Sequence, residues 1–156
     1  MPNTQAMCTS FKGELLTGTH NFGTAPVRAS GAADAFKAAL YYFDATIDAG
    51  TTTYTTAGEV SGTGYTAGGI NVTNTQAPLT SGTTAYWTPS SSLQFPNITI
   101  NSKAFNCVLI YNSTQLSGGL GRAVSVHTFG NQTVTAGTFT LTMPTNGAGT
   151  ALINIA

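Results

Sequence analysis

A short apolar run decides the fold class of this chain. It reads Phe105-Asn106-Cys107-Val108-Leu109-Ile110-Tyr111, and the extended segment Pro96-Asn97-Ile98-Thr99-Ile100 leads into it. β-Branched and aromatic residues of this kind favour a pleated, half-buried surface. The length of the run is that of a single strand. It therefore predicts a buried β-strand over residues 105–111.

The sequence after this run alternates between two sets of residues with a period of two, as strands do. The alternation is clearest in Val124-Ser125-Val126-His127-Thr128-Phe129 and in Thr138-Phe139-Thr140-Leu141-Thr142-Met143. Turn residues punctuate the chain at Asn21-Phe22-Gly23, Ser117-Gly118-Gly119, Gly130-Asn131, Ala136-Gly137 and Pro144-Thr145-Asn146-Gly147. Short strands with such punctuation predict an all-β fold: an antiparallel sandwich or a jelly-roll-like barrel with long loops rich in Gly and Thr.

Two segments are less clearly β. Residues 30–41 begin with Ser30, which could cap a helix, and continue with an Ala-rich body, yet Phe36, Ala38 and Leu40 alternate as in a strand. We favour the strand, and one short helix in this segment is the alternative. Residues 48–92 are rich in Thr, Gly, Ala and Ser. We expect ordered long loops there, with one or two strands.

Length and charge limit the organisation and the partners of the chain. Its 156 residues are expected to form one domain, residues 1–156. Five basic side chains balance five acidic ones, so no long-range field would steer the chain to nucleic acid or to an anionic membrane. No apolar stretch approaches the ~20 residues that span a bilayer. A near-neutral surface favours association, and we expect a homo-oligomer, a trimer or a dimer.

The N-terminus is polar and lacks the basic segment and apolar run of a secretory signal. Residues 1–10 are expected to form an arm that is either free or placed on a neighbouring subunit. Cys8 and Cys107 have no metal-ligand spacing. We expect two independent thiols rather than a disulfide, as in a reducing cytosol.

The most distinctive stretch is residues 59–69, which read Glu59-Val60-Ser61-Gly62-Thr63-Gly64-Tyr65-Thr66-Ala67-Gly68-Gly69. Glycines this dense permit positive φ or the close approach of another segment. The stretch lacks the Lys-Ser/Thr of a phosphate-binding loop. We interpret it as a close-packing loop, a candidate interface, anchored by Tyr65. Its lone carboxylate, Glu59, is expected either to be a solvated turn acid or to form an inter-subunit pair with Arg28, Arg122 or a partner's basic residue.

Catalytic chemistry finds little support. The two histidines, His20 and His127, have no carboxylate near them in sequence, and no Gly-x-Ser-x-Gly elbow is present. The acids Asp44 and Asp48 form neither a paired-carboxylate site nor a calcium-loop pattern. We therefore expect no enzyme, no metal and no cofactor.

Tyr86 and Trp87 are a candidate aromatic surface that could stack on a sugar. The competing interpretation places Trp87, the single tryptophan, in the core.

Three segments carry a resemblance to a known group. They are Ser10-Phe11-Lys12-Gly13-Glu14-Leu15-Leu16, the glycine stretch at 59–69, and Val134-Thr135-Ala136-Gly137-Thr138-Phe139-Thr140-Leu141-Thr142-Met143-Pro144. In composition and pattern the chain resembles short virion structural proteins of tailed bacteriophages along most of its length. The resemblance implies a β-rich fold and a place in the virus particle, and it transfers no functional residue.

Within this group, a small neutral β protein suits the capsid surface, where many copies would cover joints between capsomers. We expect a non-enzymatic capsid cement (decoration) protein that binds the major capsid protein of the assembled shell, on a virion assembled in the host cytoplasm. The alternatives are a tail, baseplate or head–tail adaptor component and, from another class, a carbohydrate-binding β-sandwich module.

Overall fold

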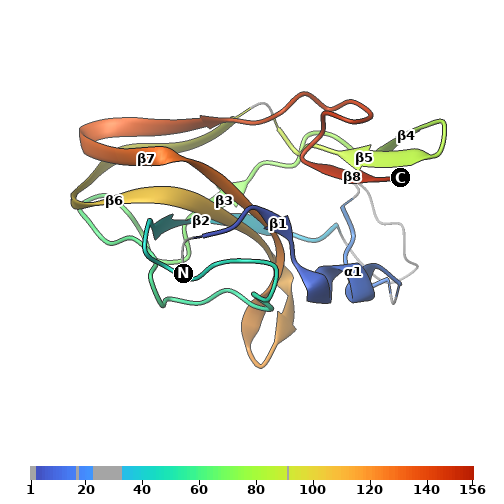
Figure 1. The fold of residues 1–156 in the computed structure, drawn as a ribbon, viewed down its shortest axis with the longest axis horizontal. Helices are drawn as coiled ribbons and strands as arrows, with labels where there is room; N and C mark the ends of the chain where they lie inside the picture. Colours follow the sequence, from blue (N-terminus) through green and yellow to red (C-terminus); the bar gives the residue numbers. More distant parts are fainter. Residues whose placement is uncertain (1–2, 17, 23–32, 91) are drawn as a thin grey trace.

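The computed structural model describes residues 3–16, 18–22, 33–90 and 92–156 (Figure 1). These residues form one helix, α1 (Thr9–Leu16), and eight strands. The strands are β1 (Ala6–Met7), β2 (Phe36–Tyr42), β3 (Ile70–Val72), β4 (Leu79–Ser81), β5 (Thr84–Trp87), β6 (Ser92–Ser117), β7 (Leu120–Thr142) and β8 (Ile153–Ile155). Every strand pair is antiparallel, and the sheets pack as a sandwich. The predicted all-β class is confirmed, while the finer jelly-roll arrangement stays a prediction.

The long strands β6 and β7 belong to both layers of the sandwich. One sheet has the strand order β1-β7-β6-β2-β3, and a small second sheet has the order β4-β5-β8. Figure 1 shows that β6 and β7 bend back over themselves, so that residues 92–101 and 131–142 lie above the plane of β2. Register shifts along the β6–β7 pair, including one between Ile100 and Phe105, accompany the bend. Bulges of this kind let a strand turn without ending.

Three of the predicted turns lie along the β6–β7 pair, and only one of them forms. Ser117-Gly118-Gly119 forms the predicted hairpin tip, where Gly118 and Gly119 have φ values of 60° and 83°. Two-residue hairpins of this type require positive φ at both positions. The turns predicted at Gly130-Asn131 and Ala136-Gly137 are wrong, because both pairs lie inside β7. Ala136 has a left-handed φ of 46°, yet β7 continues through it, so this residue forms an irregularity within the strand instead of a turn.

The strand interpretation of residues 30–41 is confirmed for its described part, and the alternative helix is wrong there; residues 30–32 lie outside the described residues. Strand β2 pairs with β6 in register Ala38↔Ile110 and Leu40↔Val108. Both alternating sets of β2 side chains are buried except at Lys37 and Tyr42, which are half-buried, so its pattern is not that of a half-exposed strand. The helix lies instead at α1, where Phe11 is fully buried. Residues 48–92 hold three short strands, one more than predicted.

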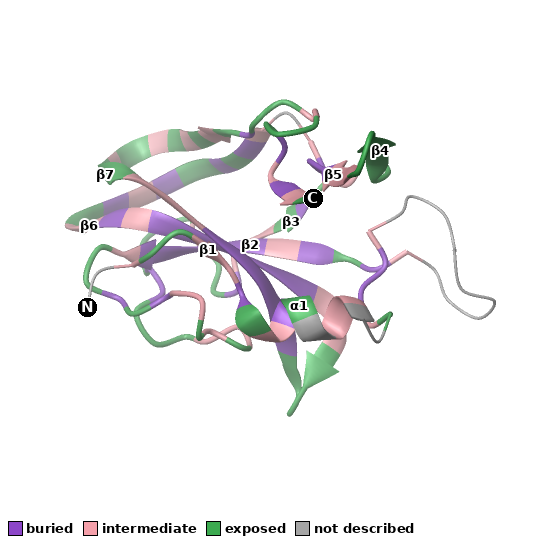
Figure 2. Cartoon of the chain, turned by 45° about the vertical axis from the view of Figure 1, so that its right-hand side comes forward, coloured by how far each residue is buried: buried purple, intermediate pink, exposed green. Residues whose placement is uncertain are grey.

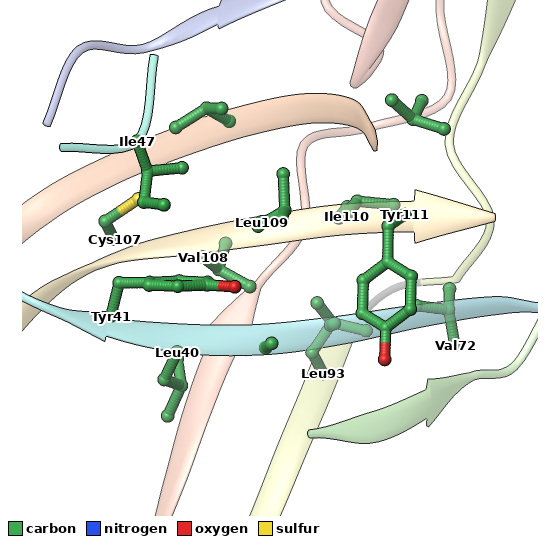
Figure 3. Close-up of a cluster of buried hydrophobic side chains, with 14 of the residues drawn as sticks. Leu40, Tyr41, Ile47, Val72, Leu93, Cys107, Val108, Leu109, Ile110 and Tyr111 are labelled. Carbon is green, nitrogen blue, oxygen red and sulfur yellow. The ribbon is translucent and has the colours of Figure 1, made fainter. Parts of the chain in front are cut away.

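The core lies between the two layers and around β2. Figure 3 shows Leu40 and Tyr41 of β2 beside Val108 and Leu109 of β6, all fully buried. Near the bend, four phenylalanines from both layers pack together, with ring centroids 5.0 to 6.1 Å apart: Phe95, Phe105, Phe129 and Phe139. This aromatic contact fastens the upper layer to the lower one. Figure 2 shows the contrast between the buried inner strands and the exposed β4 and β6–β7 hairpin tip.

The described part of the N-terminal arm packs on its own chain. Strand β1 pairs with β7 in register Ala6↔Val126. The Asn3 amide donates to the Tyr42 carbonyl at 3.1 Å and accepts from the Ile47 amide at 3.1 Å. Contact of this arm with a neighbouring subunit stays a prediction.

The two cysteines are free and buried, as predicted. Burial is the main reason that the pKa of Cys8 and the pKa of Cys107 are each raised to about 12. Within the described residues, no helix has the length and apolar character needed to cross a bilayer.

Candidate functional site

The glycine stretch at residues 59–69, called the glycine loop below, lies against β2 and β6. Glu59 forms an isolated bridge with Tyr41 of β2, and Thr63 forms one with Thr99 of β6. The Val60 amide donates to the Leu40 carbonyl at 3.0 Å. The loop therefore crosses from one strand to the next while remaining in backbone contact with both.

The glycines of this loop are required by close backbone contact. A Cβ on Gly64 would lie 2.0 Å from the carbonyl oxygen of Asn97, and one on Gly69 would lie 1.8 Å from that of Ala38. Gly62 meets the Thr99 carbonyl in the same way, at 2.0 Å. Gly64 and Gly69 also have φ values of 78° and 70°, which side-chain-bearing residues rarely adopt. These contacts confirm that the loop is closely packed within the chain, while its role as an interface stays a prediction.

Glu59 is the polar centre of the loop. It is 9% exposed, and its carboxyl oxygens accept from the Tyr54 hydroxyl at 2.5 Å, the Tyr65 hydroxyl at 2.8 Å and the Gly68 amide at 2.7 Å. The prediction of a solvated turn acid is wrong, because Glu59 is buried. Within the chain Arg122 pairs with Glu14, and Arg28 lies outside the described residues. A pair between Glu59 and a basic residue of another subunit stays a prediction.

Three tyrosines gather around Glu59: Tyr65 of the glycine loop, Tyr54 of the segment before it and Tyr111 of β6. Tyr65 donates to Glu59 and accepts from the Leu40 amide at 3.0 Å. Tyr111 of β6 donates to the Gly68 carbonyl at 2.7 Å and stacks on Tyr54 with ring centroids 4.9 Å apart. Burial, followed by the nearby carboxylate, raises the pKa of Tyr65 well above that of an ordinary phenol and that of Tyr111 to about 12.

This tyrosine–carboxylate cluster is suited to holding the loop in place. Each phenol of Tyr54, Tyr65 and Tyr111 already donates its proton within the cluster, and the raised phenol pKa values oppose ionisation at neutral pH. Tyr54 and Tyr65 lie within six residues of Glu59, so local proximity could have indicated them. Tyr111 is distant in sequence, and no signal in the sequence could have indicated it.

A second polar cluster lies near α1 and was missed by sequence reasoning. His20 Nε2 is 2.6 Å from Glu14, and Arg122 also pairs with Glu14. His20 Nδ1 is 3.0 Å from the Asn112 amide nitrogen, which donates to Asp34 at 2.8 Å. The expectation that no carboxylate lies near a histidine in sequence overlooked Glu14, which stands only six residues before His20.

Hydrogen bonding selects one protonation state for this His20. The side-chain oxygen of Asn112, Oδ1, accepts from the backbone amides of Thr114 and Gln115. The side-chain nitrogen, Nδ2, must therefore face His20 and Asp34. His20 Nδ1 then accepts, and Nε2 carries the proton toward Glu14. Burial is the main reason that the pKa of His20 is lowered. Its side chain has 0% exposure and both ring nitrogens are occupied, so this imidazole cannot reach a substrate.

The prediction that Trp87 belongs to an exposed aromatic surface is wrong. Trp87 is 2% exposed, donates its Nε1–H to the Gln76 carbonyl at 3.0 Å, and packs on Phe22 and Phe36. The competing core interpretation of Trp87 is correct, because β5 faces the aromatic core at its last residue. Tyr86 is half-buried. The pair therefore cannot form a two-ring stacking platform.

Comparison with known proteins adds no relative. No protein-family model matches the chain, and neither a curated protein nor a solved structure does. Among the residues that the structure describes, no group of three or more His, Cys, Asp or Glu side chains is placed to hold a metal ion.

Proposed function

We propose that this chain is a non-enzymatic virion structural protein of a tailed bacteriophage, and specifically a capsid cement (decoration) protein. It binds the major capsid protein on the outside of the assembled shell as a trimer or a dimer. The resemblance in composition and pattern supports the virion class. The observation that carries the capsid role is the distribution of charge over the fold.

Two long parts of the chain contain no Asp, Glu, Lys or Arg: residues 60–102 and 123–156. The whole upper layer of Figure 1 and the β4-β5-β8 sheet come from these neutral segments. Leu79 on β4 and Ile155 on β8 are 48% and 44% exposed within them. Charged groups are costly to bury and are depleted at the centres of interfaces, so a neutral face of hydroxyl and apolar groups is well suited to docking.

The mechanism is mass action. A protein that binds the assembled shell and not its free subunits stabilises the shell in proportion to its occupancy. Many copies, each with a modest contact, add up to a large stabilisation.

Particle stability tests this proposal. Particles that lack the protein are expected to release their DNA at lower temperature and under milder osmotic shock than complete particles. Adding the purified protein back should restore resistance. Equal resistance of both particles would contradict the cement role.

Charge placed on the neutral face tests the docking surface. Leu79→Glu and Ile155→Glu are expected to abolish particle binding in a sedimentation assay, because each carboxylate would have to be desolvated. The matched control is Asp44→Ala, which changes an exposed acid outside the two neutral segments and should bind normally. Undiminished binding of both glutamate variants would exclude this face.

Copy number separates the capsid role from the tail, baseplate or head–tail adaptor alternative. A capsid protein is present in hundreds of copies, whereas an axial component is expected at about six or twelve by the symmetry of the tail. Quantitative protein analysis of purified particles measures the difference.

A further inference from the structure

The hairpin tip that joins β6 and β7 carries two exposed leucines. Leu116 is 51% exposed and Leu120 is 45% exposed, which places both among the five large apolar side chains that are exposed in the described part of the chain. Residues 113–121 contain no charged side chain. Figures 1 and 2 show this tip projecting from the lower end of the molecule. Neighbouring exposed apolar groups on an uncharged projection favour association with another surface.

The two leucines lie on opposite faces of the hairpin. The register pairs Leu116 with Gly121 and Ser117 with Leu120. Paired residues share a face of a sheet and successive residues alternate between its faces, so the two leucines do not form one flat patch. Each is a single projecting side chain, which suits entry into a pocket better than contact with a flat surface.

An apolar hollow of about 180 Å³ lies between α1 and the β4-β5-β8 sheet. In this sheet Trp87 pairs with Ile153, and Ala85 pairs with Ile155. Because paired residues share a face, these four side chains point to the same side of the sheet, and all four residues line the hollow. Tyr86, which also borders the hollow, belongs to the opposite face by the same alternation.

The facing wall of the hollow comes from the helix and from the segment after it. Phe11 and Leu15, four residues apart on α1, line it together with Phe22. The ring centroid of Phe22 is 5.6 Å from that of Phe11 and 4.7 Å from that of Trp87, so the three rings form a continuous floor. Phe11 and Trp87 are buried, whereas Ile155 at the rim is 44% exposed. The hollow is therefore deep at the rings and open at β8.

The size and lining of the hollow select an apolar group as its occupant. Apolar cavities of roughly 150 Å³ take up a benzene-sized group, so about 180 Å³ is room for one leucine side chain. None of the residues that line the hollow is charged. An ionic or hydroxyl-bearing group would lose its hydration there without gaining a partner, whereas an apolar side chain would gain by leaving water.

The hairpin tip and the hollow of one molecule lie apart. In both figures the tip projects at the lower end, whereas β8, the open side of the hollow, lies in the upper half. The chain therefore carries an apolar projection and an apolar hollow of matching size on two separate surfaces. Two such surfaces on one chain can meet only between copies, and the contact closes either as a reciprocal pair or as a ring.

We propose that a leucine of the hairpin tip, Leu116 or Leu120, enters the apolar hollow of a second copy of this chain. The inference rests on the homo-oligomer of the proposed function and names the contact that holds it together. Leu79 pairs with Tyr86 and so lies on the opposite face of the small sheet from the hollow. That face stays available to the particle while the hollow is filled by the second copy.

Sedimentation equilibrium of the purified protein between about 1 µM and 1 mM tests the contact. The unmodified protein is expected to self-associate in this range. Leu116→Ser or Leu120→Ser, whichever removes the inserted side chain, should weaken the association constant roughly tenfold to a hundredfold, as expected for the loss of one buried leucine. Phe43→Ser is the matched control, because Phe43 is 42% exposed and belongs neither to the tip nor to the hollow. Its association should be unchanged.

A variant that fills the hollow tests the other side of the contact. Ala85 is half-buried and lines the hollow, so Ala85→Leu places a side chain of the chain's own where the second copy's leucine would enter. Self-association should be lost. The thermal denaturation midpoint should not fall, because the added methyl groups occupy empty space. This midpoint separates a filled hollow from a misfolded protein.

Mixing two defective variants tests that the contact joins unlike surfaces. The double variant Leu116→Ser/Leu120→Ser keeps the hollow, and Ala85→Leu keeps the hairpin tip. Each variant alone should be monomeric, and their mixture should form an equimolar complex. General stickiness of the neutral surface would not produce this pattern, because both variants retain most of that surface.

The proposal is overturned if the unmodified protein stays monomeric at about 1 mM, or if both single leucine variants associate as it does. It is also overturned if Ala85→Leu associates normally or if the mixture of defective variants forms no complex. These measurements use no virus particles. A monomeric protein would therefore contradict this contact and the homo-oligomer, while the particle assays above still decide the capsid role separately.

Discussion

At the scale of single residues, the central feature is a buried carboxyl group whose described partners are all neutral. Glu59 accepts two phenol hydrogen bonds and one backbone hydrogen bond. A donor left unpaired in a protein interior costs about 1–3 kcal/mol, more than the roughly 0.5–1.5 kcal/mol that a satisfied hydrogen bond contributes. Glu59 therefore matters less for its own burial than for the three donors that depend on it.

Removing the Glu59 acceptor is expected to destabilise the fold. Glu59→Ala leaves the hydroxyls of Tyr54 and Tyr65 and the Gly68 amide without their acceptor, at about 1–3 kcal/mol for each buried donor. We expect a loss of about 3 kcal/mol in the free energy of unfolding, measured by urea denaturation. Glu59→Gln, which keeps one acceptor oxygen, should lose less.

Asp44→Ala is the control for this measurement. Asp44 forms an exposed ion pair with Lys103, and such pairs contribute little to stability. Its denaturation midpoint should stay at that of the unmodified protein. A Glu59→Ala variant as stable as this control would show that the carboxyl group does not hold the loop.

The cysteines lead to a second prediction at this scale. With the pKa of Cys8 and of Cys107 raised to about 12 by burial, thiolate is about a thousandfold scarcer than for an ordinary cysteine. Labelling with a thiol-specific disulfide reagent at pH 8 should be at least that much slower in the native protein than in denaturant. Rapid native labelling of either thiol would contradict its burial.

At the scale of elements, the glycine loop and the β6–β7 hairpin tip use glycine for different reasons. Gly64 combines positive φ with a carbonyl oxygen 2.0 Å from the position of a Cβ. Gly118 has positive φ, 60°, but nothing within 4 Å of that position. Close approach and backbone strain can therefore be separated by comparing the two sites.

Gly64→Ala is expected to cost more than about 3 kcal/mol in the free energy of unfolding, because strand β6 must move away from the loop. Gly118→Ala should cost only the roughly 1–2 kcal/mol of left-handed backbone strain. Thermal and urea denaturation of both variants measure the difference. Equal costs would mean that the loop is not tightly packed against β6.

At the scale of the whole molecule, the titration of the histidines ties stability to pH. His20 and His127 both have a native pKa below the ordinary value of 6.5, chiefly because burial disfavours the charged ring. As the pH falls below 6.5, the unfolded chain binds protons on these rings before the native protein does. The native state therefore loses stability as the pH falls toward the native pKa values.

We expect the free energy of unfolding to be steady above about pH 7 and to fall between pH 6.5 and 5. The slope should reach up to about 1.4 kcal/mol per pH unit for each histidine. Urea denaturation across this range measures it, and His127→Asn should remove the share of that residue. A free energy that is flat or rises on acidification would contradict the neutral state of both rings.

Much of the fold could be predicted from local patterns. The buried strand at residues 105–111, the strand at Phe36 to Leu40 and the hairpin at Ser117 to Gly119 all follow from alternation and turn chemistry, which act within a few residues. The predictions at Gly130 and Ala136 were wrong because a bulge and a turn can use the same residues. Which of the two forms depends on whether the partner strand continues.

The candidate site divides in the same way. By itself, the sequence determined the β class, the single charge within the glycine loop and the need for glycine there, because composition and local backbone preference are properties of short segments. Only the tertiary structure decided that Glu59 is buried among tyrosines, that Trp87 lies in the core and that Glu14 reaches His20 and Arg122 together. Those contacts join residues from loops, the helix and strands, and the packing of these elements decides which of them meet.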